Sequence, residues 1–249
     1  MDIQDKVVVV TGASRGIGAG IARVFQRQGM KIALCARSES PPEGVELQPG
    51  RALYRPVDVQ DPDAVEAFAA AAESELGPLD LWINNAGVLA PIGMTRDVDP
   101  AAWRSLIGIN VMGVYHGARA FLNRLHAADR AGCLINIGSG ASRGAYAGWG
   151  AYCASKAAVD HLTRVLVEEE KGTGSRIYTL APGIIETAMQ EHIRAQNADD
   201  FPMVEKFRKM RDDGVLLDVE SPAEIMLDLA FGEERAFADP CVDVRDLRD

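Results

Sequence analysis

Short runs of apolar, mostly β-branched residues alternate along the chain with longer stretches that carry an apolar residue every three or four positions. Residues 7–10 are four consecutive valines, and behind them Ile17, Ile21 and Phe25 have the spacing of one helix face. Continuous apolar strands that alternate with helices are typical of a parallel sheet covered on both faces. The pattern therefore predicts an α/β fold, in which ligands bind beyond the carboxyl ends of the strands where the strand order reverses.

The same pattern indicates where the other elements lie. Asp61 and Pro62 supply an N-cap and a proline at the first helical position. Ser221 and Glu224 have the spacing of a capping box that opens the last helix. Further strands are expected at residues 31–36, 52–57, 79–83, 133–137, 177–180 and near 242–244. Further helices are expected at residues 61–76, from near 100 through 110, at 151–171 and from 221.

The chain shows no internal repeat and no linker, so we expect a single domain over residues 1–249. The expected architecture is a Rossmann-type, doubly wound parallel sheet of about seven strands flanked by helices. Residues 187–215 are rich in Met and charged residues and break the alternation of strands and helices. A long irregular insertion of this kind predicts a helical lid over the substrate site.

Composition and charge narrow the classes of function. Apolar residues make up 47% of the 249 residues, enough for a large core, and the net charge of −10 argues against a nucleic-acid or anionic-lipid partner. No signal peptide is apparent, and no apolar run reaches the ~18 residues of a membrane span. Four scattered cysteines suit a reducing compartment. We therefore expect a cytoplasmic protein without a metal site or a membrane partner.

A glycine-rich turn joins the first expected strand to the first helix. Residues 11–18 read TGASRGIG, and glycines there let the backbone approach a pyrophosphate at a helix N-terminus. The spacing differs from the general dinucleotide pattern, and a turn without function is the alternative. The candidate cofactor residues in this turn are Gly12, Ser14, Arg15, Gly16, Ile17 and Gly18.

Taken together with four later motifs, this turn resembles the short-chain dehydrogenase/reductase family, whose glycine motif is TGxxxGxG. Residues 84–87 read NNAG, as in that family after the fourth strand, and residues 182–187 match its PGxxxT motif. The resemblance covers nearly the whole chain and implies a catalytic tetrad of Asn110, Ser139, Tyr152 and Lys156. The further cofactor contacts that it implies are Asp58, Val59, Asn85, Ala86, Gly87, Tyr152, Lys156, Pro182, Gly183, Ile185 and Thr187.

The end of the second expected strand favours NADP(H) over NAD(H). NAD-binding Rossmann folds place an acidic residue there to bind the ribose 2′-hydroxyl. This chain has Ala36 at that place, followed by Arg37, and Arg15 lies in the glycine turn. Two guanidinium groups without a carboxylate suit a 2′-phosphate. Two ordinary surface arginines are the alternative.

Tyr152 and Lys156 are four residues apart at the start of a helix and share one face. A phenol that acts as an acid near neutral pH needs its pKa lowered from about 10, and a neighbouring ammonium can do this. In the family the lysine also holds the nicotinamide ribose, Ser139 would hold the carbonyl oxygen, and Asn110 would anchor a water in a proton relay. A packed tyrosine beside a solvated lysine is the simpler alternative for the pair alone.

Two other classes of protein were weighed. Residues 12–16 and 140–144 both fit the G-x-S-x-G pattern of serine hydrolases. The first lies in the nucleotide turn, and the second has only His192, in the expected lid, as a late histidine. A catalytically inactive nucleotide sensor is disfavoured because the tetrad is complete.

The C-terminal third is similar to the sepiapterin reductase branch of the family, which includes benzil-type diketone reductases. There a chain end of the form V-D-x-x-D, here at residues 242–246, closes over the substrate. Asp243 would then grip a pterin edge, and Tyr146, Trp149 and Phe201 could stack on a ring, or merely pack the lid. Ser139, Tyr146, Trp149, Tyr152 and Asp243 are the candidate substrate residues.

The expected function is NADPH-dependent reduction of a small carbonyl compound, such as a diketone or a pterin side chain, with Tyr152 as the proton donor. A 3-oxoacyl or general alcohol/carbonyl dehydrogenase of the same family is the alternative. The resemblance also implies a homodimer or homotetramer, formed through the helices that carry Asn110 and Tyr152.

Overall fold

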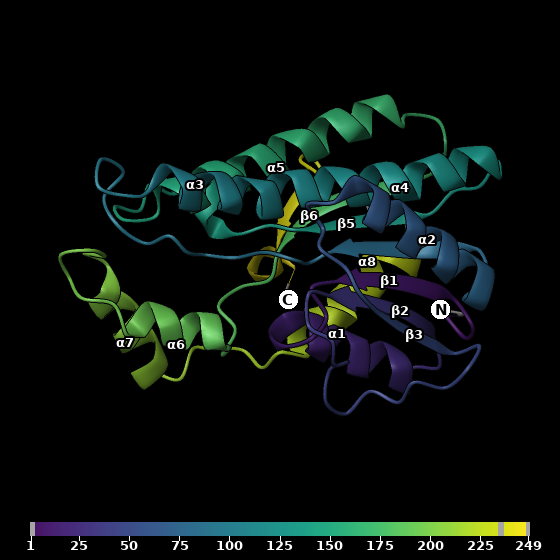
Figure 1. Cartoon of the computed structure of the whole chain (residues 1–249), viewed down its shortest axis with the longest axis horizontal. Helices are drawn as coiled ribbons and strands as arrows, with labels where there is room; N and C mark the ends of the chain where they lie inside the picture. Colours follow the sequence, from purple (N-terminus) through teal and green to yellow (C-terminus); the bar gives the residue numbers. More distant parts are fainter. Residues whose placement is uncertain (1–2, 234–236, 248–249) are drawn as a thin grey trace.

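The computed structural model describes residues 3–233 and 237–247, and it contains one seven-stranded parallel sheet (Figure 1). The strand order is β3-β2-β1-β4-β5-β6-β7, so the direction of the order changes between β1 and β4. This is the doubly wound arrangement that the sequence predicts. The strands are β1 (Val7–Thr11), β2 (Lys31–Ala36), β3 (Ala52–Pro56), β4 (Leu79–Asn84), β5 (Cys133–Ile137), β6 (Arg176–Ala181) and β7 (Cys241–Asp243).

Helices cover both faces of the sheet (Figure 1). Helices α2, α4 and α5 lie on one face, and α1 and α8 lie on the other, while α6 and α7 project from the body at the carboxyl end of the strands. The helices are α1 (Gly16–Arg27), α2 (Pro62–Leu76), α3 (Pro100–Ile107), α4 (Gly113–Ala127), α5 (Gly150–Glu169), α6 (Ala188–Arg194), α7 (Val204–Asp212) and α8 (Ser221–Phe231). Short helical turns are η1 (Gly108–Met112), η2 (Gly140–Ser142) and η3 (Val244–Asp246).

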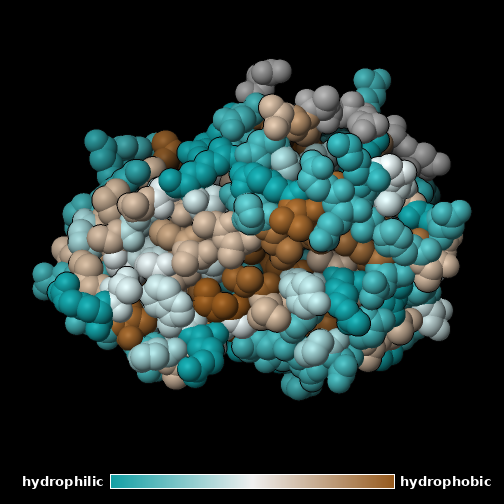
Figure 2. All heavy atoms as spheres, turned by 90° about the horizontal axis from the view of Figure 1, so that it is seen from above, coloured by the Kyte–Doolittle hydropathy of each residue, from teal (hydrophilic) through white to brown (hydrophobic). Residues whose placement is uncertain are grey.

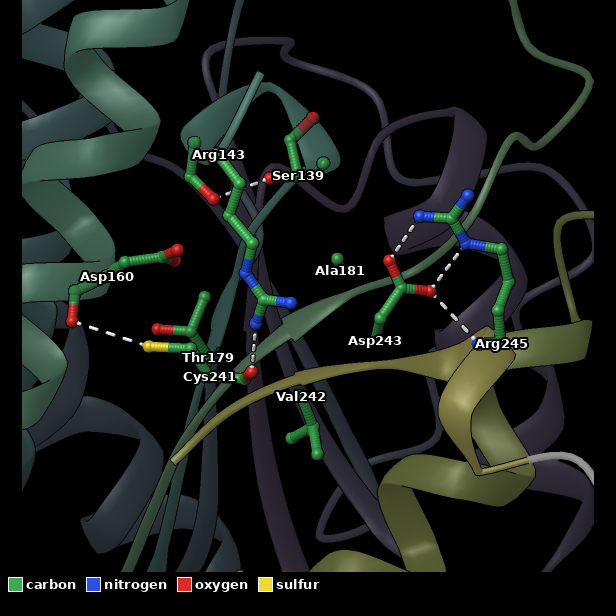
Figure 3. A pocket seen from close by; sticks show the side chains of 11 residues that line it. Ser139, Arg143, Asp160, Thr179, Ala181, Cys241, Val242, Asp243 and Arg245 are labelled. Carbon is green, nitrogen blue, oxygen red and sulfur yellow. Dashed lines mark hydrogen bonds and ion pairs between the residues drawn. The ribbon is translucent and has the colours of Figure 1, made fainter. Parts of the chain in front are cut away.

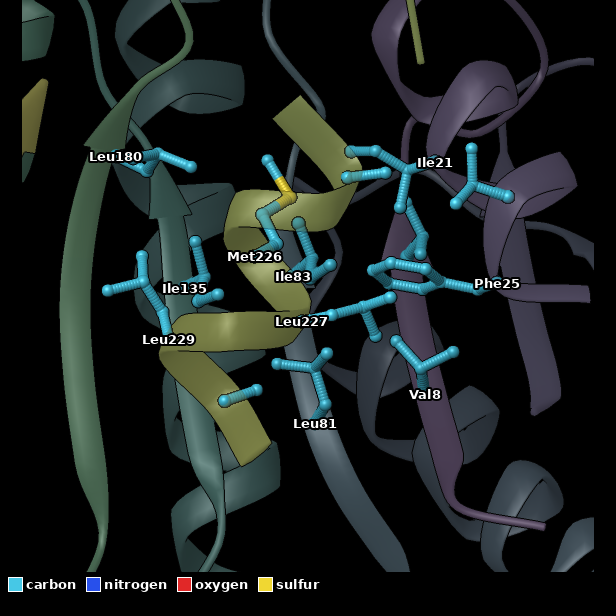
Figure 4. Packing of buried hydrophobic residues seen from close by; sticks show 14 of the residues in the cluster. Val8, Ile21, Phe25, Leu81, Ile83, Ile135, Leu180, Met226, Leu227 and Leu229 are labelled. Carbon is cyan, nitrogen blue, oxygen red and sulfur yellow. The ribbon is translucent and has the colours of Figure 1, made fainter. Parts of the chain in front are cut away.

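The continuous valine run forms a central strand because both faces of β1 are buried. Val8 and Val10 face the α1 and α8 layer, whereas Val7 and Val9 face the α2 and α4 layer. Figure 4 shows the first of these layers, where Leu227 of α8 lies over the sheet near Phe25 of α1. The alternation of side chains across a strand produces these two cores from one apolar sequence.

The structure corrects two local predictions. Ser221 does not form a capping box, because the carboxylate of Asp218 accepts hydrogen bonds from Glu220 N (2.8 Å) and Ser221 N (2.9 Å) and also binds the Ser221 hydroxyl. The helix through Asn110 is not uniform either, since a π-helical turn, η1, separates α3 from α4 there. Asp61 does cap α2 as expected, by accepting from Asp63 N and Ala64 N.

The expected lid at residues 187–215 is helical and contains α6 and α7. Its two ends are joined at the base, where Leu217 N donates to Ile184 O (2.8 Å) and Glu186 N donates to Leu217 O (3.0 Å). Arg194 pairs with Glu186 through two hydrogen bonds and packs the first lid helix onto this base. The insertion is therefore a folded unit above the strand ends.

A buried chain of polar side chains ties the sheet to α5. Asn84 of β4 donates to Asn136 Oδ1 of β5 (2.9 Å), and Asn136 donates to Thr163 Oγ1 of α5 (2.9 Å). The Thr179 hydroxyl of β6 also donates to Thr163 Oγ1 (2.6 Å). Each of these four side chains is at most 3% exposed, so their hydrogen bonds have no competition from water.

We predict that Asn136→Leu lowers the free energy of unfolding by about 1–3 kcal/mol, because it leaves an Asn84 N–H without its buried partner. Chemical denaturation measures this loss. The control is Leu47→Ala, at a side chain that is 45% exposed, and its effect should stay within about 0.5 kcal/mol. An unchanged unfolding midpoint for Asn136→Leu would show that the network does not stabilise the fold.

Candidate active site

The glycine turn brings the ends of β1 and β4 into direct contact. Gly12 has a φ of +65°, and a Cβ atom on it would lie 2.6 Å from the Cα atom of Ala86. A Cβ atom on Gly18 would lie 2.5 Å from the Asn85 side-chain amide. Only glycine fits at these two positions, since real Cβ atoms do not approach so closely. Gly18 thus serves packing, and it does not line the cleft described below.

Hydrogen bonds lock this contact. The Thr11 hydroxyl accepts from the backbone N–H groups of Asn85 and Ala86, both at 3.1 Å. In return, the Asn85 side chain donates to Thr11 O (2.8 Å) and Gly12 O (3.1 Å). The two motifs that the sequence singles out separately, TGxxxGxG and NNAG, therefore form one structural unit.

A cleft of about 1030 Å³ extends along the carboxyl ends of the strands. At one end it is lined by Arg15, Arg37 and Asp58, and at the other by Tyr146 and Tyr152. Every cofactor residue expected from the sequence lines this cleft except Gly18, and every expected substrate residue does so as well. Thr187 lies over the glycine turn, 3.6 Å from where a Cβ atom of Gly16 would be.

Asn110 does not line the cleft, because its side chain is fully buried. Its amide pairs with the backbone of Val88, accepting from Val88 N and donating to Val88 O, both at 2.8 Å. It also donates to the Ser155 hydroxyl (3.1 Å). In this structure Asn110 joins the loop after β4 to α5, and the π-helical turn η1 is what carries it inward.

Lys156 is buried at the base of the cleft, with 5% of its surface exposed. Its ammonium donates to the carbonyl oxygen of Ile137 at the end of β5 (2.7 Å) and lies 5.8 Å from the centre of the Tyr152 ring. Burial lowers the pKa of Lys156 to about 8, an effect that Asp160 partly offsets. Part of the Lys156 population is thus neutral near physiological pH.

The expected lowering of the Tyr152 pKa is wrong for the protein alone. Burial raises the pKa of the phenol, and the neighbouring Ser139 hydroxyl only partly counteracts this. The Lys156 ammonium donates to Ile137 O and lies 5.8 Å from the centre of the Tyr152 ring. Ser139 also accepts from Ala141 N (3.2 Å), which fixes its side chain at the start of η2.

Aromatic rings connect the catalytic helix to the lid. The Trp149 ring stacks on Phe201 with 4.6 Å between centroids, and Phe207 of α7 lies 5.2 Å away. Phe201 is fully buried and does not line the cleft. Trp149 and Phe201 therefore pack the lid against the start of α5. The ring of Tyr146 lies 5.2 Å from that of Trp149 and is more exposed than it.

Asp243 lines the cleft, and its carboxylate is paired with Arg245 (Figure 3). Arg245 donates to it from Nε (2.8 Å), from Nη2 (2.6 Å) and from its backbone N–H (3.0 Å). Burial raises the pKa of Asp243, but these hydrogen bonds outweigh burial and keep the pKa below its usual range. Arg248 is a second arginine near the chain end that the sequence offers as a partner for Asp243, and it lies outside the described residues.

Three residues of the site are not predicted from the sequence. Lys206 and Met210 line the cleft from the lid. Ser155 is fully buried, does not line the cleft, and binds Asn110. The lid residues carry no motif, so no sequence signal identifies them. Ser155, by contrast, lies three residues after Tyr152 on the same helix, and helical spacing could have indicated it.

The described residues form neither a metal site nor a membrane-spanning helix. Within residues 3–233 and 237–247 no group of three or more His, Cys, Asp or Glu side chains could hold a metal ion. No helix in that part of the chain is long and apolar enough to cross a membrane. Burial raises the pKa of the Cys35, Cys133 and Cys241 thiols to about 12, so these thiols remain protonated.

Comparisons with known proteins agree with this geometry. A family model described as short chain dehydrogenase matches residues 6–198, more than half of the chain. The chain is therefore a member of the short-chain dehydrogenase/reductase family and an oxidoreductase. The family match overturns the serine hydrolase alternative.

Relatives of nearly full length support the branch of the family that resembles benzil reductases. The benzil reductase ((S)-benzoin forming) of Bacillus cereus is 28% identical over 92% of this chain and 95% of its own length. The crystal structure of a short-chain dehydrogenase/reductase from Saccharomyces cerevisiae has a TM-score of 0.84 and 29% identity, covering 96% and 95% of the two chains. The meso-2,3-butanediol dehydrogenase of Serratia marcescens is 34% identical over 76% of this chain and 75% of its own length.

Enzymes of this family use nicotinamide cofactors, and the cleft fits one. Gly12 has no side chain and packs on Ala86, so no Cβ atom covers the backbone of the turn at this position. Helix α1 begins directly after the turn, and pyrophosphate binds at such a helix N-terminus. The choice between NAD and NADP is part of the proposal that follows.

The buried Lys156 ammonium predicts a pH dependence of stability. Between the folded pKa of about 8 and the unfolded pKa of 10.5, the unfolded chain binds more protons, so stability rises with pH in this window. Lys156→Met removes this dependence. Relative to that variant, the unmodified protein should gain about 2 kcal/mol in free energy of unfolding between pH ~7.5 and ~9.5. A constant difference across that range, measured by chemical denaturation, would contradict the burial cost.

Proposed function

We propose that the protein is an NADPH-dependent reductase of small carbonyl compounds. The observation that carries the proposal is the arrangement of Ser139, Tyr152 and Lys156 around the inner end of the cleft, with Ser139 in contact with the Tyr152 hydroxyl. These are the groups needed to bind a carbonyl oxygen and to supply a proton to it.

The chain's own residues divide the chemistry as follows. When bound, the cofactor supplies the hydride. The Ser139 and Tyr152 hydroxyls hold the carbonyl oxygen, and Tyr152 gives its proton to that oxygen as negative charge develops. Lys156 supplies positive charge beside Tyr152, which stabilises the phenolate that remains. Asn110 is a positioning residue, because its amide binds the backbone of Val88, in the loop that lines the cleft.

Replacing Tyr152 by Phe removes the proposed proton donor but keeps the ring that contacts Trp149. We expect turnover to fall by about 10²-fold or more, while NADPH affinity stays nearly unchanged. Steady-state rates together with cofactor binding measured by fluorescence test this. Near-normal reduction of a good substrate by the variant would mean that Tyr152 does not donate the proton.

The cofactor end of the cleft supports NADP(H). Arg15 and Arg37 are exposed at the cleft wall, and Ala36 takes the place where a carboxylate would repel a 2′-phosphate. Among the cleft-lining residues the carboxylates are Asp58 and Asp243. Asp58 already accepts from Gln60 N and lies beyond β3, where the family resemblance places the adenine.

For this reason Arg37→Ala should reduce the preference for NADPH over NADH by about 1.5–3 kcal/mol, the strength of a charged hydrogen bond. The ratio of kcat/KM for the two cofactors measures the preference. Arg96→Ala, at an exposed arginine with an 80% accessible side chain, is the matched control and should leave the ratio unchanged. Equal kcat/KM for both cofactors in the unmodified enzyme would refute the assignment.

The substrate class follows less directly. The full-length benzil reductase relative and the rings of Tyr146 and Trp149 at the substrate end support an aromatic 1,2-diketone or a similar carbonyl. The butanediol dehydrogenase relative favours instead a general alcohol/carbonyl enzyme, the alternative that the sequence leaves open. Binding of a pterin edge by Asp243 remains a prediction, and it requires Arg245 to release the carboxylate.

We also propose a homodimer or homotetramer in the cytoplasm, built through the helical layer that faces the viewer in Figure 2. Apolar side chains are exposed across this layer, with Tyr115 of α4 44% and Val165 of α5 40% exposed. A second copy of the chain would cover them.

Light scattering should therefore give a mass of at least two chains for the unmodified protein, and Tyr115→Glu combined with Val165→Glu should give single chains because burying two carboxylates is costly. Glutamate at exposed Leu47, outside this layer, is the control. A monomeric unmodified protein would contradict the proposal.

A further inference from the structure

The cleft is basic although the chain as a whole is acidic. The sequence has 36 Asp and Glu residues against 26 Lys and Arg residues, yet the lining of the cleft reverses this balance. Its carboxylates are Asp58 and Asp243, as noted above. Its cationic side chains are Arg15, Arg37, Lys156, Lys206 and Arg245. Clefts lined by one sign of charge concentrate ligands of the opposite sign.

Two of these cations belong to the substrate end and have no role in the proposed reaction. Arg245 follows β7, and its side chain remains 67% exposed although it binds both oxygens of Asp243. Figure 3 shows both oxygens of Asp243 bound by Arg245, so Asp243 is not a free acid. Both residues line the cleft. A Cβ atom on Gly140, the residue after Ser139, would lie 3.6 Å from Arg245 Nη2.

Lys206 approaches from the lid. It is exposed on α7, and its ammonium lies 6.0 Å from the centre of the Tyr146 ring. Among the described residues this ammonium forms no ion pair, and the Tyr146 ring is a neighbour that it has at the cleft. Asp243 raises the pKa of Arg245, and Tyr146 adds a smaller electrostatic contribution, so Tyr146 is near both cations.

A row of three aromatic rings extends from these cations to Tyr152, the proposed proton donor. Tyr146 lies 5.2 Å from Trp149, and Trp149 lies 5.7 Å from Tyr152. An apolar or aromatic body of a substrate could lie along Tyr146 with its carbonyl at Tyr152. Any anionic group on that body would then meet the Lys206 ammonium, which has no carboxylate partner among the described residues, and the exposed side of the Arg245 guanidinium, whose Nε and Nη2 already bind Asp243.

We propose that the substrate carries an anionic group, such as a carboxylate, beside its carbonyl-bearing aromatic or apolar body, and that Lys206 and Arg245 bind this group. The inference rests on the proposed reductase function and narrows its substrate class. Asp243 then acts as a positioning residue, since its carboxylate holds the Arg245 guanidinium at the edge of the cleft.

A matched pair of probes tests the proposal: an aryl 1,2-diketone with a carboxylate on the ring, and the methyl ester of the same compound. With NADPH, kcat/KM for the carboxylate should exceed that for the ester by about tenfold or more, the effect of a charged hydrogen bond. Lys206→Ala should reduce kcat/KM about fivefold or more for the carboxylate and less than twofold for the ester. Lys209→Ala, at an exposed lysine of the same helix that does not line the cleft, is the control and should change neither.

Arg245 is tested without leaving a buried charge unpaired by combining Arg245→Gln with Asp243→Asn. This double variant should lose the preference, so that kcat/KM for the carboxylate and for the ester become equal. Added salt should also reduce the preference, because the screening length falls from about 30 Å at 0.01 M to about 10 Å at 0.1 M. Equal kcat/KM for the two probes, or equal effects of Lys206→Ala on both, would overturn the inference while leaving the reductase function intact.

If neither probe is reduced, the proposed reductase function is wrong. The anion site is then tested separately, by comparing how tightly the two probes bind. Calorimetric titration of the NADPH-loaded protein with each probe gives the two dissociation constants. Tighter binding of the carboxylate that is lost in Lys206→Ala supports the site. Equal binding of carboxylate and ester overturns it.

Discussion

The carboxyl ends of β1 and β4 are tied together by the Thr11 hydroxyl and the Asn85 side chain, and the cleft depends on that tie. These two strands flank the point where the strand order changes direction, so helices leave the sheet there on opposite faces. With glycine at positions 12 and 18, the turn after β1 lies flat against the loop after β4. The cofactor end of the cleft is the surface that this packing leaves open.

The other end of the cleft depends on burial of charge. Lys156 donates to Ile137 O, and burial lowers its pKa to about 8, which costs stability below that pH. A buried cation that destabilises the fold and lines a cleft is the usual mark of a functional group. Tyr152, raised in pKa in the protein alone, stays protonated and thus able to donate.

Much of the fold could be predicted because its strands are continuous apolar runs. β2 and β5 begin and end at the predicted residues, and β3 ends one residue earlier. The start of α8 could not be predicted from Ser221 and Glu224, because Asp218 lies closer to the free N–H groups and binds them. Local spacing cannot decide between two competing caps.

For the site, the motifs located the residues that line the cleft, but not how they are paired. Asn110 was expected to anchor a water, and the structure shows its amide bonded to Val88 and Ser155. The Asp243–Arg245 pair and the approach of Lys206 depend on the path of β7 and of the lid, and no short pattern encodes that path. In the proposed function, β7 and the lid supply most of the residues that would select the substrate.

In the proposed reaction a hydride passes from NADPH to a carbonyl carbon in this cleft while Tyr152 protonates the oxygen. A single-turnover reaction of an aryl 1,2-diketone with NADPH that is deuterated at the transferring position of the nicotinamide measures this transfer. We expect one deuterium on the carbinol carbon of the hydroxyketone for each NADPH oxidised. NADPH oxidation without deuterium in the product, or no oxidation by folded, NADPH-bound protein with any carbonyl offered, would contradict it.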